Sequence, residues 1–177
     1  MVSERVLKEL NQQVNEELYS EYIYLSMAAD LVDKGFKGMA TWMRVQAREE
    51  HVHAMIFYNF ITERRAKVEL DAIKMPPTTW DSPLTIFEAA HEHEKFITGR
   101  IDHMVKIALE ENDNATYQML QWFVEEQVEE EANTDEMATN LRIVGVDGQG
   151  ILMIDREAGS RTFIVPQAPY YPAPGQQ

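Results

Sequence analysis

Carboxylates and one imidazole recur at fixed intervals inside stretches of the chain whose apolar residues have helical spacing. These polar residues are Glu17, Glu50, His53, Glu94, Gln127 and Glu130. Glu17 and Glu50 are 33 positions apart, and so are Glu94 and Gln127. The first half of the set also maps onto the second with one offset of 77 positions, because 17 becomes 94, 50 becomes 127 and 53 becomes 130. The repeat predicts two matching halves that contribute to one site.

Carboxylates that converge in an apolar interior need a counter-charge. Like charges at short range raise each other's pKa, and burial adds to this effect. Divalent metal ions remove the conflict. Each half offers one polar residue from one helix and a pair at positions i and i+3 from the other, which is the arrangement that holds a di-iron or di-manganese centre in a bundle. Oxygen ligands with a single imidazole favour iron or manganese over copper.

Single members of this set carry little information by themselves. A lone Glu in an apolar stripe usually reaches solvent through its flexible side chain, whereas the whole symmetric set does not arise readily from solvated faces. Tyr24 lies two turns after Glu17 on the same face, which fits either a role at the site or simple core packing. The other histidines are expected on the surface or at subunit contacts, and they are His51, His91, His93 and His103.

Four segments with helical periodicity would carry these residues, and they span about 4–33, 37–64, 83–111 and 114–144. Ser3 is the predicted N-cap of the first segment. Ser82 is the predicted N-cap of the third segment, and Pro83 is its first helical position. Gly35 and Gly38 supply the turn after the first segment. Four long helices of similar length, without a strand signal, predict an all-α four-helix bundle. The first helix is expected to bury a stripe that is apolar except at Glu17. Its apolar members are Leu7, Leu10, Val14, Leu18, Leu25, Ala28 and Leu31.

The positions of the turns indicate how the polar residues meet. The midpoint of positions 17 and 50 falls in the turn after the first helix, and the midpoint of positions 94 and 127 falls in the turn after the third. In an antiparallel hairpin, two residues equally far from the turn lie at the same height, here roughly 25 Å from the loop. Two such hairpins facing each other would gather the whole set into one buried cluster.

The longest connection, residues 65–82, contains Pro76 and Pro77, which favour an extended chain. It can span about 60 Å, which exceeds the length of about 42 Å of a 28-residue helix. A long crossover between the second and third helices is therefore expected. The sequence ILMIDREA at 151–158 predicts a short fifth helix of one or two turns, with a strand as the alternative. We expect a helical unit at 1–159 and an extended Pro- and Tyr-rich tail at 160–177.

The charge balance narrows the possible partners. Thirty Asp and Glu against sixteen Lys and Arg give a net charge of −14, which disfavours nucleic acid and anionic membranes and favours cations. The absence of cysteine excludes disulfides, thiol nucleophiles and iron–sulfur clusters. No apolar run approaches the roughly 18 residues of a membrane span, and the N-terminus lacks a signal pattern. The expected compartment is the cytoplasm.

With these residues in hand, the sequence resembles the non-haem ferritins of bacteria and archaea. The matching segments are NEELYSEYIYLSM at 15–27, WMRVQAREEHVHA at 42–54, EHEKFITGRI at 92–101 and LQWFVEEQVEEEA at 120–132. The likeness covers all four helices and continues to about residue 157, so it implies a ferritin-like bundle with a short fifth helix. His51 follows Glu50, where a bacterioferritin would have a haem-binding Met, so no haem is expected. The mini-ferritins and rubrerythrins fit less well.

The resemblance implies a di-iron centre within one subunit. By that likeness Glu17, Glu50 and His53 would bind the first iron. Glu50 would bridge to a second iron, which Glu94 and Glu130 would hold. Gln127 would lie beside the di-iron centre as a hydrogen-bonding partner.

The resemblance also assigns some of the surplus acids. Glu49, Glu126 and Glu129, together with Glu130, match the third iron position beside the di-iron centre in the family. Tyr24 matches the tyrosine that lies near the site in such proteins. These assignments extend the metal set beyond the residues of the repeat.

The function implied by the resemblance is ferroxidase activity with iron storage. Fe(II) would be oxidised to Fe(III) by O2 or H2O2 and stored as a mineral inside a hollow shell of twenty-four subunits. One alternative is a carboxylate-bridged di-iron oxygenase or peroxidase without iron storage. A second is a non-catalytic helical interaction protein whose polar cluster only specifies the packing of its helices.

Overall fold

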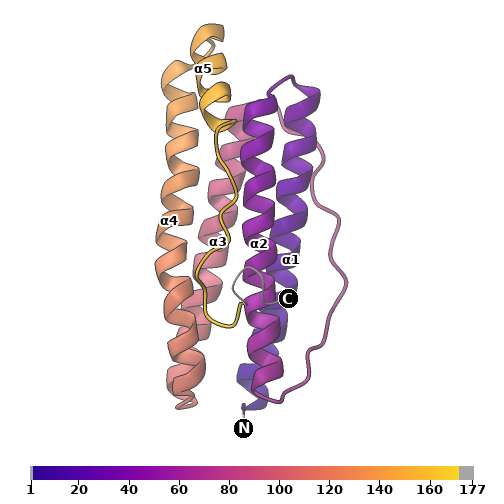
Figure 1. Ribbon diagram of the computed structural model, residues 1–177, viewed down its shortest axis with the longest axis vertical. Helices are drawn as coiled ribbons and strands as arrows, with labels where there is room; N and C mark the ends of the chain where they lie inside the picture. Colours follow the sequence, from indigo (N-terminus) through magenta and orange to yellow (C-terminus); the bar gives the residue numbers. More distant parts are fainter. Residues whose placement is uncertain (1, 172–177) are drawn as a thin grey trace.

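A computed structural model describes residues 2–171 of the 177-residue chain. Its helices are α1 (Glu4–Asp33), α2 (Lys37–Glu63), α3 (Pro83–Glu110), α4 (Asn114–Val144) and α5 (Gly148–Ala158). The four long helices lie side by side and α5 lies at one end of the bundle (Figure 1). The described part of the chain contains no strand, so the all-α prediction is confirmed. Among the described helices, none combines the length and apolar character needed to cross a membrane.

The helices begin where the local sequence satisfies their free N–H groups. The side chain of Ser3 accepts a hydrogen bond of 3.2 Å from the backbone N–H of Val6. Ser82 and Thr85 exchange side-chain and backbone hydrogen bonds in a capping box, with Pro83 in the first turn of α3. Such N-caps are each worth about 1 kcal/mol. Local signals alone therefore set these boundaries within one residue of the expected ones.

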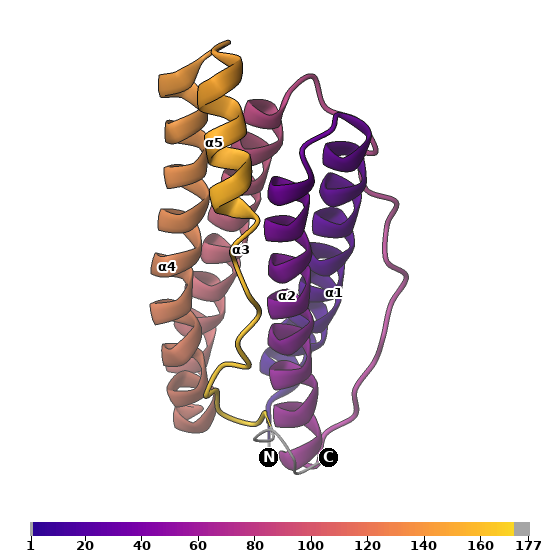
Figure 2. The ribbon, with the colours of Figure 1, turned by 45° about the horizontal axis from the view of Figure 1, so that its top comes forward.

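The connection between α2 and α3 runs the length of the bundle. Residues 65–82 pass along the outside of α1 from one end of the molecule to the other (Figures 1 and 2). The side-chain amide of Asn11 donates to the carbonyl of Lys67 at 3.2 Å, and the hydroxyl of Ser26 donates to the carbonyl of Pro77 at 2.6 Å. The crossover is confirmed, and it makes α2 and α3 parallel, so the two hairpins face each other.

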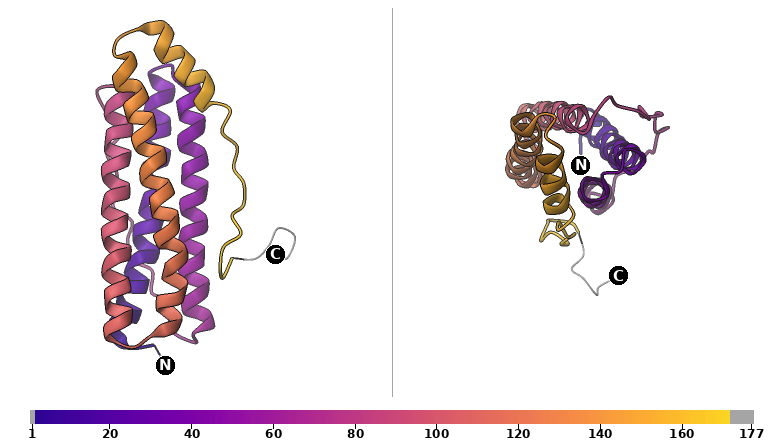
Figure 3. Two further views of the ribbon diagram at one scale, coloured as in Figure 1. Left: turned by 90° about the vertical axis from the view of Figure 1, so that its left-hand side faces the viewer. Right: turned by 90° about the horizontal axis from the view of Figure 1, so that it is seen from above.

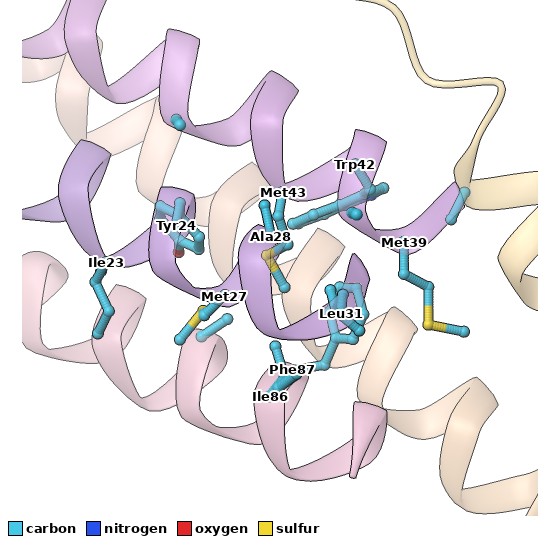
Figure 4. Packing of buried hydrophobic residues seen from close by; sticks show 14 of the residues in the cluster. Ile23, Tyr24, Met27, Ala28, Leu31, Met39, Trp42, Met43, Ile86 and Phe87 are labelled. Atoms are coloured by element: carbon cyan, nitrogen blue, oxygen red, sulfur yellow. The ribbon is translucent and has the colours of Figure 1, made fainter. Parts of the chain in front are cut away.

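Two apolar clusters fill the bundle on either side of a polar layer. One contains Tyr24, Met27, Met43 and Phe87, which converge from α1, α2 and α3 (Figure 4). The other is built largely from aliphatic and aromatic residues that include Leu10, Ile56, Phe57, Phe60, Ile101, Leu120 and Phe123. Burial of such side chains contributes roughly 1.5–3 kcal/mol each. These clusters hold the polar layer between them.

The expected stripe of α1 is wrong at Leu25, which is 45% exposed. Tyr24, one position earlier, is fully buried. The buried face of α1 instead runs through Glu17, Ser20, Tyr24 and Ala28. Because two members of that face are polar, a search for apolar residues alone shifts the stripe towards Leu25.

Helix α5 is longer than expected, with 11 residues instead of one or two turns, and the strand alternative is wrong. It begins at Asp147, whose carboxylate accepts hydrogen bonds from the backbone of Gln149 and Gly150. It approaches α2 closely, since a Cβ atom on Gly38 would lie 1.6 Å from the carbonyl oxygen of Asp155. The close contact explains why glycine occupies position 38.

The chain after α5 turns back along the bundle. Residues 161–168 have no regular secondary structure and run alongside α2 (Figure 3). The extended course expected for the tail is therefore confirmed as far as residue 168. The last part of the tail, 172–177, lies outside the described residues. The division into a unit at 1–159 and a tail at 160–177 stays a prediction.

Candidate metal centre

The polar layer brings residues from all four long helices within metal-binding distance. Three groups of side chains have ligand atoms within 4.8 Å of one another, namely Glu17–Glu50–His53, Glu50–Glu94–Glu130 and His53–Glu126–Glu130. Glu50 belongs to the first two groups. The five residues of these first two groups are all at most 3% exposed. The structure therefore gathers the carboxylates of the sequence repeat, and does so in two overlapping sets.

The electrostatics of the cluster are those of crowded acids. Burial and the neighbouring Glu50 raise the pKa of Glu17 to about 8, and the same two causes raise the pKa of Glu130 to about 8. Burial, Glu50 and Glu130 also raise the pKa of Glu94 well above its ordinary value. Burial opposes ionisation of Glu50, but His53, together with Gln46 and His93, lowers the pKa of Glu50 below its ordinary value. A cation would relieve this conflict.

Two buried atoms of the first group have no hydrogen-bond partner within the described part of the chain. They are Oε2 of Glu17 and Nε2 of His53. An unsatisfied buried polar atom costs roughly 1–3 kcal/mol, so native proteins rarely keep one without a reason. The Nδ1 atom of His53 is already occupied, since it lies 3.2 Å from Oε2 of Glu50. The donor set fits a cation that accepts oxygen and imidazole ligands.

Tyr24 and Gln127 both contact Glu94. The phenol of Tyr24 donates a hydrogen bond to one carboxylate oxygen of Glu94. The side-chain amide of Gln127 donates to the other carboxylate oxygen at 3.3 Å, and also lies 3.3 Å from the hydroxyl of Thr98. The two residues thus contact the Glu94 carboxylate from opposite hairpins.

Two glutamines that the sequence analysis did not assign to the site form a further layer. The amide of Gln13 donates to Glu17 at 2.9 Å, and the amide of Gln46 donates to Glu50 at 2.9 Å and to Glu130 at 2.7 Å. Each glutamine lies one turn before its glutamate, and the two are 33 positions apart. They therefore obey the spacing of the repeat, which could have revealed them.

The acids expected at a third position are placed differently from one another. Glu126 is partly buried and has an oxygen 3.9 Å from Nε2 of His53. Glu49 is also partly buried, but its carboxylate forms an ion pair with Arg161. Glu129 is exposed and belongs to none of the three groups found among the described residues. Of these three acids, only Glu126 thus lies in a potential ligand group.

The remaining histidines divide into two pairs. His51 and His103 are exposed, as expected. His91 and His93 are partly buried, and their expected position at the surface or at a subunit contact stays a prediction. His91 contacts the hydroxyl of Thr134 at 3.3 Å, and His93 contacts the hydroxyl of Ser20 at 2.8 Å. Both packing partners come from other helices, which sequence spacing does not reveal.

A bundle of four long helices with a full-length crossover and carboxylate groups between its helices is the architecture of ferritin-like proteins. The ferritin-like domain profile matches residues 7–144. The chain belongs to the ferritin family.

Several relatives match nearly the whole chain. A bacterial non-haem ferritin of Bacteroides fragilis is 38% identical over 161 residues, which cover 91% of this chain and 100% of the relative. A bacterial non-haem ferritin of Campylobacter jejuni is 35% identical over 156 residues, which cover 88% of this chain and 93% of the relative. The crystal structure of an open-pore ferritin from the archaeon Archaeoglobus fulgidus has a TM-score of 0.91 and 46% identity. The match covers 92% of this chain and 100% of that one.

Proposed function

We propose that this protein is a ferroxidase that stores iron. Its substrate is Fe(II), which binds as a pair within one subunit. The first ion uses Glu17, Glu50 and His53, and the second uses Glu50 with Glu94 and Glu130. The single observation that carries this proposal is the membership of Glu50 in two buried ligand groups. A residue shared in this way is suited to bridge two ions.

The chemistry follows from the charges of the ligands. Each Fe(II) loses one electron, and O2 that accepts two electrons and two protons becomes H2O2. Oxidation raises the charge on each ion, and a site of four carboxylates favours the more highly charged Fe(III). Carboxylate ligands exchange readily. A ligand set with a single imidazole therefore also lets the Fe(III) product leave the site. Haem is not expected to take part.

The partly buried Glu126 supports a route out of this centre. It shares a potential ligand group with His53 and Glu130, which belong to the first and second sets respectively. We assign Glu126, with Glu49, Glu129 and Glu130, to a third iron position through which oxidised iron passes. Because Glu129 is exposed, this position faces outward from the bundle.

Iron storage requires assembly into a container. We propose a hollow shell of twenty-four subunits in which Fe(III) is deposited as a mineral. The family membership and the likeness to an open-pore ferritin support this part of the proposal. The net charge of −14 favours the entry of cations over that of anions.

The test is aerobic Fe(II) oxidation by the variant Glu94→Ala. Loss of this buried carboxylate should abolish the fast phase of oxidation and leave the assembly size unchanged in size-exclusion chromatography. The matched control is Glu92→Ala, two positions earlier on α3, where the side chain is exposed and pairs only with Lys95 among the described residues. Unchanged oxidation kinetics in Glu94→Ala would remove the catalytic assignment.

Two further measurements separate the alternatives. A small oligomer that retains no iron mineral after aerobic loading would favour a di-iron oxygenase or peroxidase. Purified protein that binds no iron at all would favour a non-catalytic helical protein. A large assembly that retains many iron ions per subunit would support storage.

A further inference from the structure

The segment that follows α5 reaches the metal centre through one residue, Arg161. Its guanidinium donates a hydrogen bond of 2.9 Å to Oε1 of Gln46 and pairs with the carboxylate of Glu49. The same group lies 4.2 Å from the centre of the Trp42 ring. Three partners on α2 thus fix one side chain that is only 20% exposed. Arg161 is more than 110 positions from each of its hydrogen-bond partners, so the contact is purely tertiary.

The contact with Gln46 determines which way its amide points. A side-chain amide has one oxygen that accepts and one nitrogen that donates. Since Arg161 occupies the oxygen, the nitrogen is directed at Glu50 and Glu130, at 2.9 and 2.7 Å. Arg161 therefore acts through Gln46 on two carboxylates of the metal centre. Arg100 has the same relation to Gln13, because its Nε atom donates to Oε1 of Gln13 at 3.0 Å.

The contact with Glu49 has a different consequence. Among the described residues, the third ligand group contains His53, Glu126 and Glu130 but not Glu49. The carboxylate of Glu49 is instead engaged by the arginine. A planar guanidinium matches the geometry of a carboxylate and remains charged at all relevant pH values. It therefore competes directly with any cation that uses Glu49.

Other contacts hold this segment in place independently of Arg161. The ring of Phe163 lies 4.0 Å from the guanidinium of Arg48. The backbone carbonyl of Tyr170 accepts a hydrogen bond of 2.9 Å from Asn59, and its ring packs on Phe60. Because Phe163 and Tyr170 anchor the segment to α2 by themselves, Arg161 can be replaced without removing these contacts.

We propose that Arg161 is a positioning residue that withholds Glu49 from the third cation position until a cation displaces the arginine. This inference rests on the proposed function, because it assumes that cations occupy the di-iron positions. Without Glu49, Glu126 is the one member of the third ligand group that neither di-iron group uses, because His53 and Glu130 already belong to those groups. The order of filling is then set by the protein, with the third position last. Loss of Arg161 should make the third position bind more tightly.

The experiment is an anaerobic calorimetric titration of the assembled protein with Zn²⁺, a cation that undergoes no oxidation. The variant Arg161→Gln removes the charge and the fork of donors. We expect the third Zn²⁺ to bind about tenfold more tightly than in the unaltered protein, whereas the first two should gain no affinity, because Gln46 loses the contact that fixes its amide. A factor of ten corresponds to roughly 1.4 kcal/mol, close to the value of a hydrogen bond to a charged group.

Three further variants separate the proposed cause from general effects. Arg156→Gln removes an exposed arginine of α5 and should leave all Zn²⁺ affinities unchanged. Arg161→Lys keeps the charge but loses the planar set of guanidinium donors. Its affinity for the third Zn²⁺ should therefore lie between those of the unaltered protein and Arg161→Gln. Adding Glu49→Gln to Arg161→Gln should abolish the gain, because the released carboxylate is then absent.

The possible results have distinct meanings. The proposal would be overturned if Arg161→Gln bound the third Zn²⁺ with unchanged or weaker affinity. It would also be overturned if Arg156→Gln gained as much affinity for the third Zn²⁺ as Arg161→Gln. Absence of tight Zn²⁺ binding at the first two positions in the unaltered protein would instead overturn the proposed function. Melting temperatures and assembly sizes of all variants, measured without metal, establish that each variant is folded before it is titrated.

Discussion

The phenol of Tyr24 on α1 donates a hydrogen bond to the carboxylate of Glu94 on α3. The bond joins the two helical hairpins across the polar layer. Both residues are buried, at 0% and 1% exposure. Because the donor and the acceptor belong to opposite halves of the sequence repeat, this contact links the halves directly.

The first prediction concerns that bond. Tyr24→Phe should lower the free energy of unfolding of the metal-free protein by about 1–3 kcal/mol, because a buried acceptor loses its donor. The measurement is chemical denaturation in the presence of a chelator. Tyr22→Phe is the matched control, since Tyr22 lies on the same helix and is 50% exposed. Equal stabilities of the two variants would contradict the importance of the bond.

The second prediction is a pH dependence of stability without metal. In the folded protein the pKa values of Glu17 and Glu130 are about 8, against an ordinary value of 4.5. Between these values the folded state holds more protons than the unfolded state at these two groups, so their contribution to stability is greatest below pH 4.5 and falls as pH rises towards 8. The slope is roughly 1.4 kcal/mol per pH unit for each such proton.

The melting temperature of chelator-treated protein should therefore decrease between pH 5 and pH 8, within the window set by those pKa values. Glu17→Gln should reduce the slope, because one titrating carboxyl is replaced by a neutral amide of similar shape. Added Zn²⁺ should restore stability at pH 8 by binding the ionised carboxylates of the folded state. A flat or rising profile without metal would show that burial does not raise these pKa values.

The third prediction distinguishes a shared ligand from an unshared one. Glu50 belongs to two of the ligand groups, whereas Glu17 belongs to one. Anaerobic calorimetry should therefore show that Glu50→Gln weakens the first two Zn²⁺ ions together, while Glu17→Gln weakens only one of them. If both variants lost a single ion, Glu50 would not be a bridge.

The fourth prediction uses a pair of glycines. Gly38→Ala should destabilise the protein by about 1–3 kcal/mol, the usual cost of overpacking, because the added methyl group would overlap the carbonyl of Asp155. Gly99→Ala has nothing within 4 Å of the added group and should stabilise α3 by about 0.5–1 kcal/mol. Thermal unfolding of the two variants gives the comparison. Similar melting temperatures would show that α5 can shift away from α2 at little cost.

Much of this protein could be read from local sequence. Ser3, Ser82 and the periodic apolar residues determine where the helices begin and how far they extend, because capping and helical spacing depend on residues only a few positions apart. The register of Glu17 against Glu50 also follows, since both lie equally far from one turn. The family resemblance supplied further assignments, among them the third-position acids, whose roles remain proposals.

Other features depend on contacts between residues far apart in the chain. The exposure of Leu25 and the contact of His93 with Ser20 follow from which helices pack against α1 and α3, not from spacing within one helix. The length of α5 could not be read from its apolar residues, because its first turn consists of glycines and Gln149.

The tertiary structure alone brought Arg161 to Gln46 and Glu49. No periodicity predicts where an irregular segment lies, because its position is set by side-chain contacts with distant helices. The sequence thus determined which acids meet in the bundle, since helical geometry and turn symmetry are local properties. The fold decided which of those acids an arginine occupies, since that depends on how the last segment packs across α2.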